Sequence, residues 1–302
     1  MMVQILLSTY NGAKYLKPLM ESLLAQDYPH IEILVRDDGS NDGTVDLLQQ
    51  YAAANTNIKV VPSVNLGFVK SFFKLLELSS PTADYIALCD QDDVWLRDKV
   101  SRAVELLSRY PGEIPLLYCS RLAVVDENLK LLGYTDVPRK GLSFRNALVE
   151  CPPGLGATIL LNQKARQLLY DFPQEIYSHD WWIYLVLSCF GNIIYDEEPR
   201  ILYRKHTSNV FGVYFGLIDR WKVKIYRFKT GKFHLMLYQA MEFMRIYGSS
   251  LSEEYKSILE RFIANRKRCW RDRILYALSC EVYHQSTLEH LILRVLIALN
   301  RL

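Results

Sequence analysis

Hydrophobic and polar positions alternate regularly over the first 110 residues of the chain. Short apolar runs with the length of buried strands occur at residues 3–7, 31–35, 58–61 and 85–89. Apolar residues at helical spacing fill the intervening segments 14–26, 44–54, 67–78 and 97–110. Strand–helix alternation with short links predicts right-handed crossovers and a mainly parallel sheet covered by helices. The predicted fold class is therefore α/β.

The pattern is less regular beyond residue 110. It predicts strands at 116–119 and 157–161, an apolar helix at 179–190, and a late hairpin made of 193–195 and 201–204. Seven Gly and Pro residues within 133–156 predict a long ordered loop region that could shape a substrate pocket. From residue 214 onward the pattern is helical. We therefore expect a domain of residues 1–213 and a helical C-terminal extension of residues 214–302.

Charge separates the two predicted parts. The whole chain of 302 residues has a net charge of +3, but residues 219–302 hold 16 Lys/Arg against 8 Asp/Glu. Residues 219–229 interleave cations with aromatics, a composition that suits the interface of an anionic membrane. An apolar helix face is predicted from Leu288, Leu291, Ile292, Val295, Leu296 and Leu299. The extension is thus either a peripheral membrane contact or a helical bundle that packs on the domain or on a second subunit.

Cysteine usage and the absence of targeting signals bear on the compartment. The six Cys are scattered and form no CxxC pair, which argues against a zinc site and fits a reducing compartment. The N-terminus lacks the basic leader of a signal peptide, and no uncharged apolar stretch reaches about 18 residues. We expect a cytoplasmic protein, with any membrane contact at the inner face of the membrane.

Three polar clusters follow three of the predicted strands. They are Ser8-Thr9-Tyr10-Asn11-Gly12, Asp37-Asp38-Gly39-Ser40 and Asp90-Gln91-Asp92-Asp93. In open parallel sheets, ligands bind beyond the carboxyl ends of the strands. The third cluster has three carboxylates in four residues, which repel one another unless a cation lies between them. Hard oxygen ligands without neighbouring His or Cys suit Mg²⁺ or Mn²⁺, and the alternative is an acidic loop that caps the helix beginning near residue 96.

Other nucleotide-binding signatures are missing. No GxGxxG follows the first strand, and no GxxxxGK[ST] occurs in the chain, which disfavours a dinucleotide oxidoreductase and a P-loop NTPase. The three clusters, in this order, resemble the signatures of family 2 glycosyltransferases over residues 2–210. The Gln within the acidic cluster, followed by Val94-Trp95, further resembles bacterial rhamnosyltransferases of cell-surface polysaccharide synthesis.

The resemblance implies a fold and a reaction. The fold is the glycosyltransferase A type, a nucleotide-sugar-binding sheet flanked by helices. The reaction is an inverting, metal-dependent transfer of a sugar from a dTDP- or UDP-sugar, with dTDP-L-rhamnose as the expected donor. The implied acceptor is a saccharide or a lipid-linked saccharide of a growing cell-surface polysaccharide, and no nucleic acid is expected as a partner.

The resemblance also assigns the donor side of the site. Tyr10 and Ser8 correspond to residues that hold the nucleotide base, through an aromatic face and a hydroxyl. Asp38, the second acid of its cluster, corresponds to the residue that accepts a hydrogen bond from the pyrimidine ring, and its alternative role is that of a turn residue. Gln91 and Asp93 are further candidates for contacts with the donor.

The metal and the general base are assigned in the same way. Asp90 and Asp92 match the pair that holds Mg²⁺ or Mn²⁺ against the diphosphate. His206 matches a late metal-binding or diphosphate-binding His, and Arg204 is a candidate phosphate contact. Asp180 matches the general base of inverting transfer, although many relatives have Glu where this chain has His179, and its alternative role is that of a helix cap.

Two other functions remain open on the sequence. A nucleotidyltransferase that makes nucleotide sugars on a related fold would carry a glycine-rich basic loop after the first strand, and residues 8–12 lack one. A catalytically idle scaffold for glycan enzymes would not need the intact acids Asp90, Asp92 and Asp180.

Overall fold

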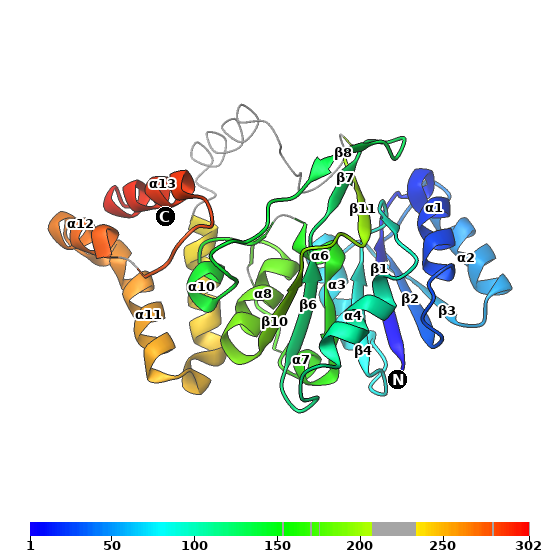
Figure 1. Ribbon diagram of the computed structural model, residues 1–302, viewed down its shortest axis with the longest axis horizontal. Coiled ribbons are helices and arrows are strands. Elements are labelled where there is room, and N and C mark those ends of the chain that lie inside the picture. Colours follow the sequence, from blue (N-terminus) through cyan, green and yellow to red (C-terminus); the bar gives the residue numbers. More distant parts are fainter. Residues whose placement is uncertain (153, 170, 175, 207–233, 280, 302) are drawn as a thin grey trace. The chain divides into compact units, whose positions relative to one another are not determined.

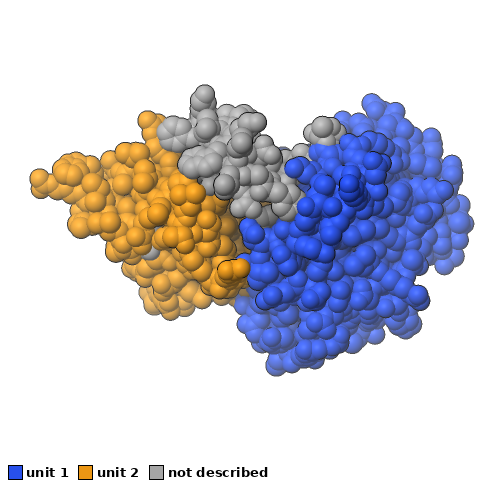
Figure 2. Space-filling model, turned by 45° about the horizontal axis from the view of Figure 1, so that its top comes forward, with its two compact units in different colours: residues 1–137, 153–170, 191–213 blue, residues 138–152, 171–190, 214–302 orange. Residues whose placement is uncertain are grey.

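The computed structural model describes residues 1–152, 154–169, 171–174, 176–206, 234–279 and 281–301. The chain divides into two compact units, which Figure 2 colours separately. Unit 1 comprises residues 1–137, 153–170 and 191–213, and unit 2 comprises residues 138–152, 171–190 and 214–302. Unit 2 thus takes two segments from the middle of the chain in addition to the predicted extension.

Within the described residues, all the strands belong to unit 1, and Figure 1 labels most of them. The strands are β1 (Val3–Thr9), β2 (Ile31–Asp37), β3 (Ile58–Pro62), β4 (Tyr85–Cys89), β5 (Val94–Trp95), β6 (Leu116–Ser120), β7 (Ala123–Val125), β8 (Leu131–Tyr134), β9 (Leu160–Asn162), β10 (Asn192–Asp196) and β11 (Ile201–Arg204). Its helices are α1 (Ala13–Leu24), α2 (Thr44–Ala54), α3 (Phe68–Leu78), α4 (Lys99–Leu107), α6 (Leu155–Thr158) and α7 (Gln163–Gln167).

The main sheet has seven strands in the order β10-β6-β9-β4-β1-β2-β3. Strands β4, β1, β2 and β3 are parallel to one another, and β10 is parallel to β6. Strand β9 runs antiparallel between β4 and β6. A smaller sheet has the order β5-β11-β7-β8. The α/β class and the mainly parallel sheet predicted from the sequence are confirmed.

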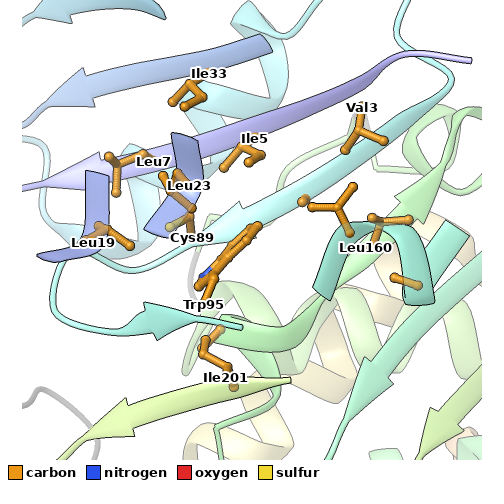
Figure 3. Packing of buried hydrophobic residues seen from close by; sticks show 14 of the residues in the cluster. Val3, Ile5, Leu7, Leu19, Leu23, Ile33, Cys89, Trp95, Leu160 and Ile201 are labelled. Carbon is orange, nitrogen blue, oxygen red and sulfur yellow. The ribbon is translucent and has the colours of Figure 1, made fainter. Parts of the chain in front are cut away.

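The core of unit 1 lies where the sheet meets its covering helices. Val3, Ile5 and Leu7 alternate along one face of β1 and are completely buried, as are Leu16 and Leu19 of α1. Figure 3 shows the packing of this cluster around Trp95 and Ile201. Each fully buried side chain of this size contributes roughly 1.5–3 kcal/mol. Because helix and strand faces are both apolar, the strand ends are held in fixed positions at the sheet edge.

Two predicted elements are wrong in detail. Residues 155–158 form α6 rather than the start of a strand, and β9 begins at Leu160. All four residues of α6 are buried, and a short apolar run does not distinguish a buried helical turn from a strand. The late hairpin does not form either, because β10 pairs with β6 in the main sheet whereas β11 pairs with β7 and β5 in the smaller one.

Unit 2 is helical in the part that the structure describes. Its elements are α5 (Phe144–Ala147), α8 (His179–Phe190), α10 (His234–Tyr247), η1 (Gly248–Ser250), α11 (Glu253–Ala264), η2 (Asn265–Lys267), α12 (Trp270–Ser279) and α13 (Thr287–Ala298). Phe243 of α10 packs against the aromatic rings of Phe144 and Trp182, and α12 packs against α13. The predicted interfacial segment 219–229 lies outside the described residues. Within those residues, no helix is both long enough and apolar enough to cross a membrane.

Candidate functional site

The carboxyl ends of three neighbouring strands lie together at one edge of the main sheet. In the parallel register, Thr9 of β1 faces Asp37 of β2, and Leu7 of β1 faces Cys89 of β4. The three polar clusters predicted from the sequence begin at or just beyond these residues. The structure therefore brings the three clusters to the same edge.

Asp37 organises the turn after β2. Its Oδ1 accepts hydrogen bonds from Thr9 Oγ1 (2.8 Å) and Ser40 Oγ (2.5 Å), and its Oδ2 accepts from the backbone N–H groups of Gly39 (3.1 Å) and Ser40 (2.8 Å). Gly39 has a φ of 83°, a conformation that other residues rarely adopt. Asp37 is therefore a residue that shapes the loop and is held by four donors of the chain itself.

Asp38 is buried, with 2% of its surface exposed. Arg36 Nη1 donates to its Oδ1, as does the backbone N–H of Leu66 (2.7 Å), and the N–H of Gly67 donates to its Oδ2 (2.9 Å). The side chain of Arg36 is itself only 1% exposed and also donates to Ser71 Oγ (2.9 Å). Asp38 thus connects the end of β2 to the loop before α3. These hydrogen bonds support its alternative role as a turn residue, and its contact with the base stays a prediction.

Arg36 is a residue that sequence reasoning missed. It lies within strand β2, where a charged side chain normally points to solvent. The sequence of β2 contains no pattern that predicts burial of this side chain. Ser71, in the first turn of α3, is completely buried and also contacts Ser8, with 2.6 Å between the two hydroxyl oxygens. Ser8, predicted to bind the base, therefore shares a hydrogen-bonded network with Arg36 and Asp38.

Gln91 joins the first cluster to the third. Its Oε1 accepts from the backbone N–H of Tyr10 (2.7 Å), and its Nε2 donates to the carbonyl of Tyr10 (2.9 Å). A Cβ at Gly12 would lie 2.3 Å from Gln91 Oε1, so only glycine leaves room for this pairing. The Tyr10 side chain remains 48% exposed. The amide of Gln91 is thereby used to position the loop that presents the Tyr10 ring.

The acidic cluster contains a buried carboxylate oxygen, on Asp93, without a hydrogen-bond partner among the described residues. Asp93 is completely buried, its Oδ1 accepts from the N–H of Arg204 (3.0 Å), and its Oδ2 has no hydrogen-bond partner among the described residues. Burial, together with the neighbouring Asp92 and Asp90, raises the pKa of Asp93 well above its usual range. Buried carboxylates are normally satisfied, so this arrangement of clustered acids fits a site for a divalent cation.

Strand β11 brings two predicted residues to these acids. His206 Nε2 lies 2.8 Å from Asp92 Oδ2, and the His206 ring stacks on Tyr15 with 4.7 Å between ring centroids. Arg204 donates from Nε to the carbonyl of Asp92 (2.8 Å) and from Nη1 to that of Glu127 (2.6 Å). Arg204 therefore holds the acidic loop in place, and its predicted phosphate contact stays a prediction.

Not every predicted ligand is gathered. Of the residues that the structure describes, only Glu150, His284 and Glu289 of unit 2 place ligand atoms from three side chains all within 4.8 Å of one another. Asp92 and His206 do meet, as given above, but Asp90 does not complete such a group with them. Joint binding of a metal by Asp90, Asp92 and His206 stays a prediction.

A buried amine lies beneath the acidic cluster. Lys99, at the start of α4, is 1% exposed, and its Nζ lies 3.4 Å from the centroid of the Trp95 ring. Burial lowers the pKa of Lys99 to about 7, against the opposite influence of Cys89 and Asp93. No local pattern predicts a buried lysine at this position, because Lys99 lies at the start of a helix, where charged residues are usually solvated.

Asp180 belongs to unit 2, whereas the other predicted site residues belong to unit 1. It lies in the first turn of α8, where a carboxylate interacts favourably with the helix dipole, and its Oδ1 accepts from the N–H of Trp181 (2.8 Å). The adjacent His179 is buried, and this burial lowers its pKa to about 4. The ring N–H of Trp181 donates to the carbonyl of Ala147 (2.6 Å), so Trp181 is a packing residue here.

Comparisons with known proteins test the resemblance. Residues 4–129 match the model of glycosyl transferase family 2. The chain is 26% identical over 233 residues to the dTDP-rhamnosyl transferase RfbG of Shigella flexneri, covering 72% of this chain and 77% of RfbG. The resemblance to family 2 glycosyltransferases that the three clusters indicate is therefore confirmed.

Solved structures show the same fold. The crystal structure of S. aureus TarS 1–349 in complex with UDP-GlcNAc has a TM-score of 0.62 and 17% identity, and the match covers 100% of this chain and 81% of TarS. Mannosyltransferase PcManGT from Pyrobaculum calidifontis, in complex with GDP-Man and Mn²⁺, has a TM-score of 0.54 and 14% identity, covering 98% and 80%. The fold is of the glycosyltransferase A type, and glycosyltransferase activity is supported for the chain.

Proposed function

We propose that this chain is an inverting, metal-dependent glycosyltransferase that moves L-rhamnose from dTDP-L-rhamnose to a saccharide acceptor of a cell-surface polysaccharide. The observation that supports this most is the joining of three polar clusters at one sheet edge, with His206 on Asp92 and Gln91 on the Tyr10 backbone. The name of the relative RfbG supports a dTDP-rhamnosyl donor. TarS and PcManGT bind UDP-GlcNAc and GDP-Man, which supports a nucleotide sugar in general.

The chain's own residues divide the work at the donor. The exposed Tyr10 ring offers a face on which a pyrimidine can stack, and Ser8 lies in the network behind it. Asp92, Asp90 and His206 would hold the divalent ion, Mg²⁺ or Mn²⁺, which as a Lewis acid neutralises charge on the departing diphosphate. Arg204 keeps the acidic loop in register through its bonds to the Asp92 carbonyl and to Asp93.

Asp180 is the proposed general base. During transfer, a bond forms between the acceptor oxygen and the anomeric carbon while the bond from that carbon to the diphosphate oxygen breaks. The acceptor hydroxyl must lose its proton on the side opposite the leaving group, and a carboxylate can accept that proton. The electron pair of the broken bond leaves with the nucleoside diphosphate. Because the acceptor oxygen attacks from the face opposite the leaving group, the anomeric configuration inverts.

The Asp180→Asn variant tests the proposed base. We expect donor affinity to be retained and transfer to fall by roughly 10²–10⁴, the usual effect of losing a general base. Asp272, another carboxylate in the first turn of a helix, provides the matched control, because Asp272→Asn changes a first-turn charge without touching the proposed base. A near-normal rate in Asp180→Asn would reject the base, and lost donor binding would move Asp180 to the donor side.

The donor is tested separately. A thermal-shift series with dTDP-L-rhamnose, UDP-GlcNAc and GDP-mannose, each with and without Mn²⁺, should show the largest metal-dependent rise in Tm with dTDP-L-rhamnose, because a ligand that binds only the folded state stabilises it by RT ln(1 + [L]/Kd). A larger shift with another nucleotide sugar would overturn the choice of donor while leaving the glycosyltransferase assignment intact.

A peripheral contact of unit 2 with an anionic membrane forms the second part of the proposal. On α12, Trp270 and Leu278 are 60% and 66% exposed. The outer face of α13 is formed by Leu288, Leu291, Val295 and Leu299, all exposed. An exposed apolar face of this extent on two contacting helices favours an interfacial role. Exposed cations lie nearby in sequence, at Arg266, Lys267, Arg271 and Arg301.

Vesicle sedimentation tests the membrane contact. The full chain should bind vesicles that contain phosphatidylglycerol, should bind pure phosphatidylcholine less, and should be released by salt. The double variant Leu291→Glu/Val295→Glu should lose binding, whereas Leu24→Glu, a substitution of an exposed leucine in unit 1, should retain it. Binding unchanged by the double variant, or self-association abolished by it, would identify the face as something other than a membrane contact.

A further inference from the structure

Unit 2 contains a compact group of metal-ligating side chains that the proposed transfer reaction does not use. Glu150 follows α5, His284 lies in the segment before α13, and Glu289 lies in the first turn of α13. Ligand atoms of all three lie within 4.8 Å of one another, and the three side chains are 16%, 15% and 26% exposed. The group is thus sheltered from solvent, and it joins Glu150 to two residues that lie more than 130 positions later in the sequence.

The distances within the group are those of ligands around an ion rather than those of hydrogen bonds. His284 Nδ1 lies 3.4 Å from Glu150 Oε2 and 3.7 Å from Glu289 Oε2. Hydrogen bonds from N–H to oxygen are usually 2.7–3.2 Å long. Tetrahedral coordination with bonds of 2.0–2.2 Å separates neighbouring ligand atoms by about 3.3–3.5 Å. His284 Nδ1 is also buried and has no hydrogen-bond partner among the described residues.

The backbone around the group is already fixed by hydrogen bonds. Glu150 Oε2 accepts from the N–H of Gln285 (2.7 Å) and from Asn146 Nδ2 (2.8 Å). Lys140 Nζ donates to the carbonyl of His284 (2.8 Å), and Asn146 Nδ2 also donates to the carbonyl of Tyr283 (2.9 Å). Donors of this kind orient ligating carboxylates and raise metal affinity in protein sites. Little conformational entropy would therefore be lost when an ion binds here.

We propose that Glu150, His284 and Glu289 form a second metal site, which takes a zinc-type divalent ion and ties the segment before α13 to the segment after α5. Imidazole nitrogen with two carboxylates is a donor set for Zn²⁺ rather than for Mg²⁺, which prefers oxygen ligands and retains its waters. Two carboxylates and a neutral imidazole also balance the charge of a divalent ion. A solvent molecule or a further side chain completes the coordination. The role is structural, because the site joins two segments of one unit.

The competing explanation is an ion-pair cluster. A protonated His284 between two glutamates would also be electrostatically favourable and would need no metal. The two explanations differ in their response to added zinc, because the ion-pair cluster already carries its cation and has no place for a second one. They also differ in the number of zinc ions bound. A metal site predicts one equivalent that depends on His284 and Glu289 and not on the acids of the donor site.

Zinc titration of the full chain after treatment with EDTA is the direct test. Equilibrium dialysis followed by metal analysis should show one more equivalent of bound Zn²⁺ in the unmodified chain than in His284→Gln or Glu289→Gln, and no loss in His30→Gln, which removes an exposed histidine of unit 1. The Asp92→Asn variant should keep this equivalent, because it alters only the donor site. Zinc should raise the Tm of the unmodified chain by several degrees and leave that of Glu289→Gln unchanged.

A spectroscopic measurement on the unmodified chain keeps the proposal testable even if the variants fail to fold. Co²⁺ in place of Zn²⁺ should give the intense visible absorption of a four-coordinate site, and added Zn²⁺ should remove it. Equal zinc stoichiometry in the unmodified chain and both site variants would overturn the proposal, as would a cobalt spectrum of six-coordinate ions only. Either result would identify the group as an ion-pair cluster.

Discussion

Two acidic clusters of unit 1 lie at the same edge of the main sheet, one beginning at Asp37 at the end of β2 and one following β4. Their carboxylate oxygens have different partners. Asp37 and Asp38 together accept seven hydrogen bonds from the chain, from three side chains and four backbone N–H groups. In the second cluster, Asp93 Oδ2 is buried without a partner among the described residues. A carboxylate with internal donors builds a loop, whereas clustered acids that include a buried oxygen without a donor are suited to a cation.

The two clusters also differ in the cations that lie next to them. The first cluster has Arg36, whose side chain is 1% exposed, as a permanent counter-ion of Asp38. In the second cluster, Arg204 donates to Asp93 through its backbone N–H and to the Asp92 carbonyl through Nε. The nearby Lys99 has a pKa that burial lowers to about 7, so that its positive charge is not assured near neutral pH. Removing one negative charge should therefore harm the first cluster mainly through stability and the second mainly through activity.

The largest expected effect is on catalysis by Asp92→Asn. Loss of a carboxylate at the proposed metal site should lower the rate of transfer by more than about 10³-fold, since a metal supplies several kcal/mol of charge stabilisation and each 1.36 kcal/mol corresponds to a factor of ten. The free energy of unfolding should change little, because the substitution relieves repulsion with Asp90 and Asp93. Initial rates at saturating donor and metal, together with urea unfolding, measure both quantities.

Asp46→Asn is the matched control for this substitution. Asp46 lies in the first turn of α2 and is not part of either cluster, so its loss should leave the rate of transfer within about twofold, as is usual for surface substitutions. If Asp92→Asn turned over at a normal rate in saturating Mg²⁺ or Mn²⁺, the metal assignment of the second cluster would fail. If Asp92→Asn unfolded instead, the distinction between the clusters would fail.

The sequence predicted the fold well where each element follows its own periodicity. Helix α2 and strand β4 have the predicted bounds, and the three clusters lie at one edge because parallel strands end together. Prediction failed where pairing partners are distant in the chain. Strand β9 inserts between β4 and β6, and β11 joins a second sheet, and neither choice of partner is visible in a local pattern.

The site shows the same limit. The acidic cluster could be predicted as a site because its three carboxylates follow an apolar strand directly. His206 was predicted only through the family resemblance. The internal partners of these groups were not predicted, because Arg36 and Lys99 are ordinary polar residues until tertiary packing buries them. Gln91 was predicted to contact the donor, and its pairing with the Tyr10 backbone was not predicted. The site residues themselves, including Asp180 in unit 2, stay predictions.

The same isosteric substitution in the first cluster should give the opposite pattern. Asp38→Asn leaves Arg36 buried without its counter-charge, so the free energy of unfolding should fall by about 1.5–3 kcal/mol, the range for a hydrogen bond to a charged group. Binding of dTDP should weaken, while the rate at saturating donor should change less than in Asp92→Asn. Urea unfolding and nucleotide titration of both variants, made side by side, measure these quantities. Loss of activity without loss of stability in Asp38→Asn would contradict the comparison of the two clusters.

The last prediction concerns Lys99 and the dependence of stability on pH. The folded state binds the Lys99 proton with a pKa of about 7, whereas an unfolded chain binds it near the usual value of 10.5. Below pH 7 the folded state therefore bears the full cost of a buried ammonium, and this cost declines as the pH rises from about 7 toward 10.5. Lys99→Met should thus stabilise the fold most below pH 7, and its advantage should shrink by about 1 kcal/mol per pH unit above that. Urea unfolding at pH 6, 7.5 and 9 measures the trend, with Lys74→Met, an exposed lysine paired with Glu77, as the control. A constant difference across this range would show that Lys99 keeps its charge when folded, through the Trp95 ring and Asp93. The second cluster would then have a second buried cation in addition to Arg204.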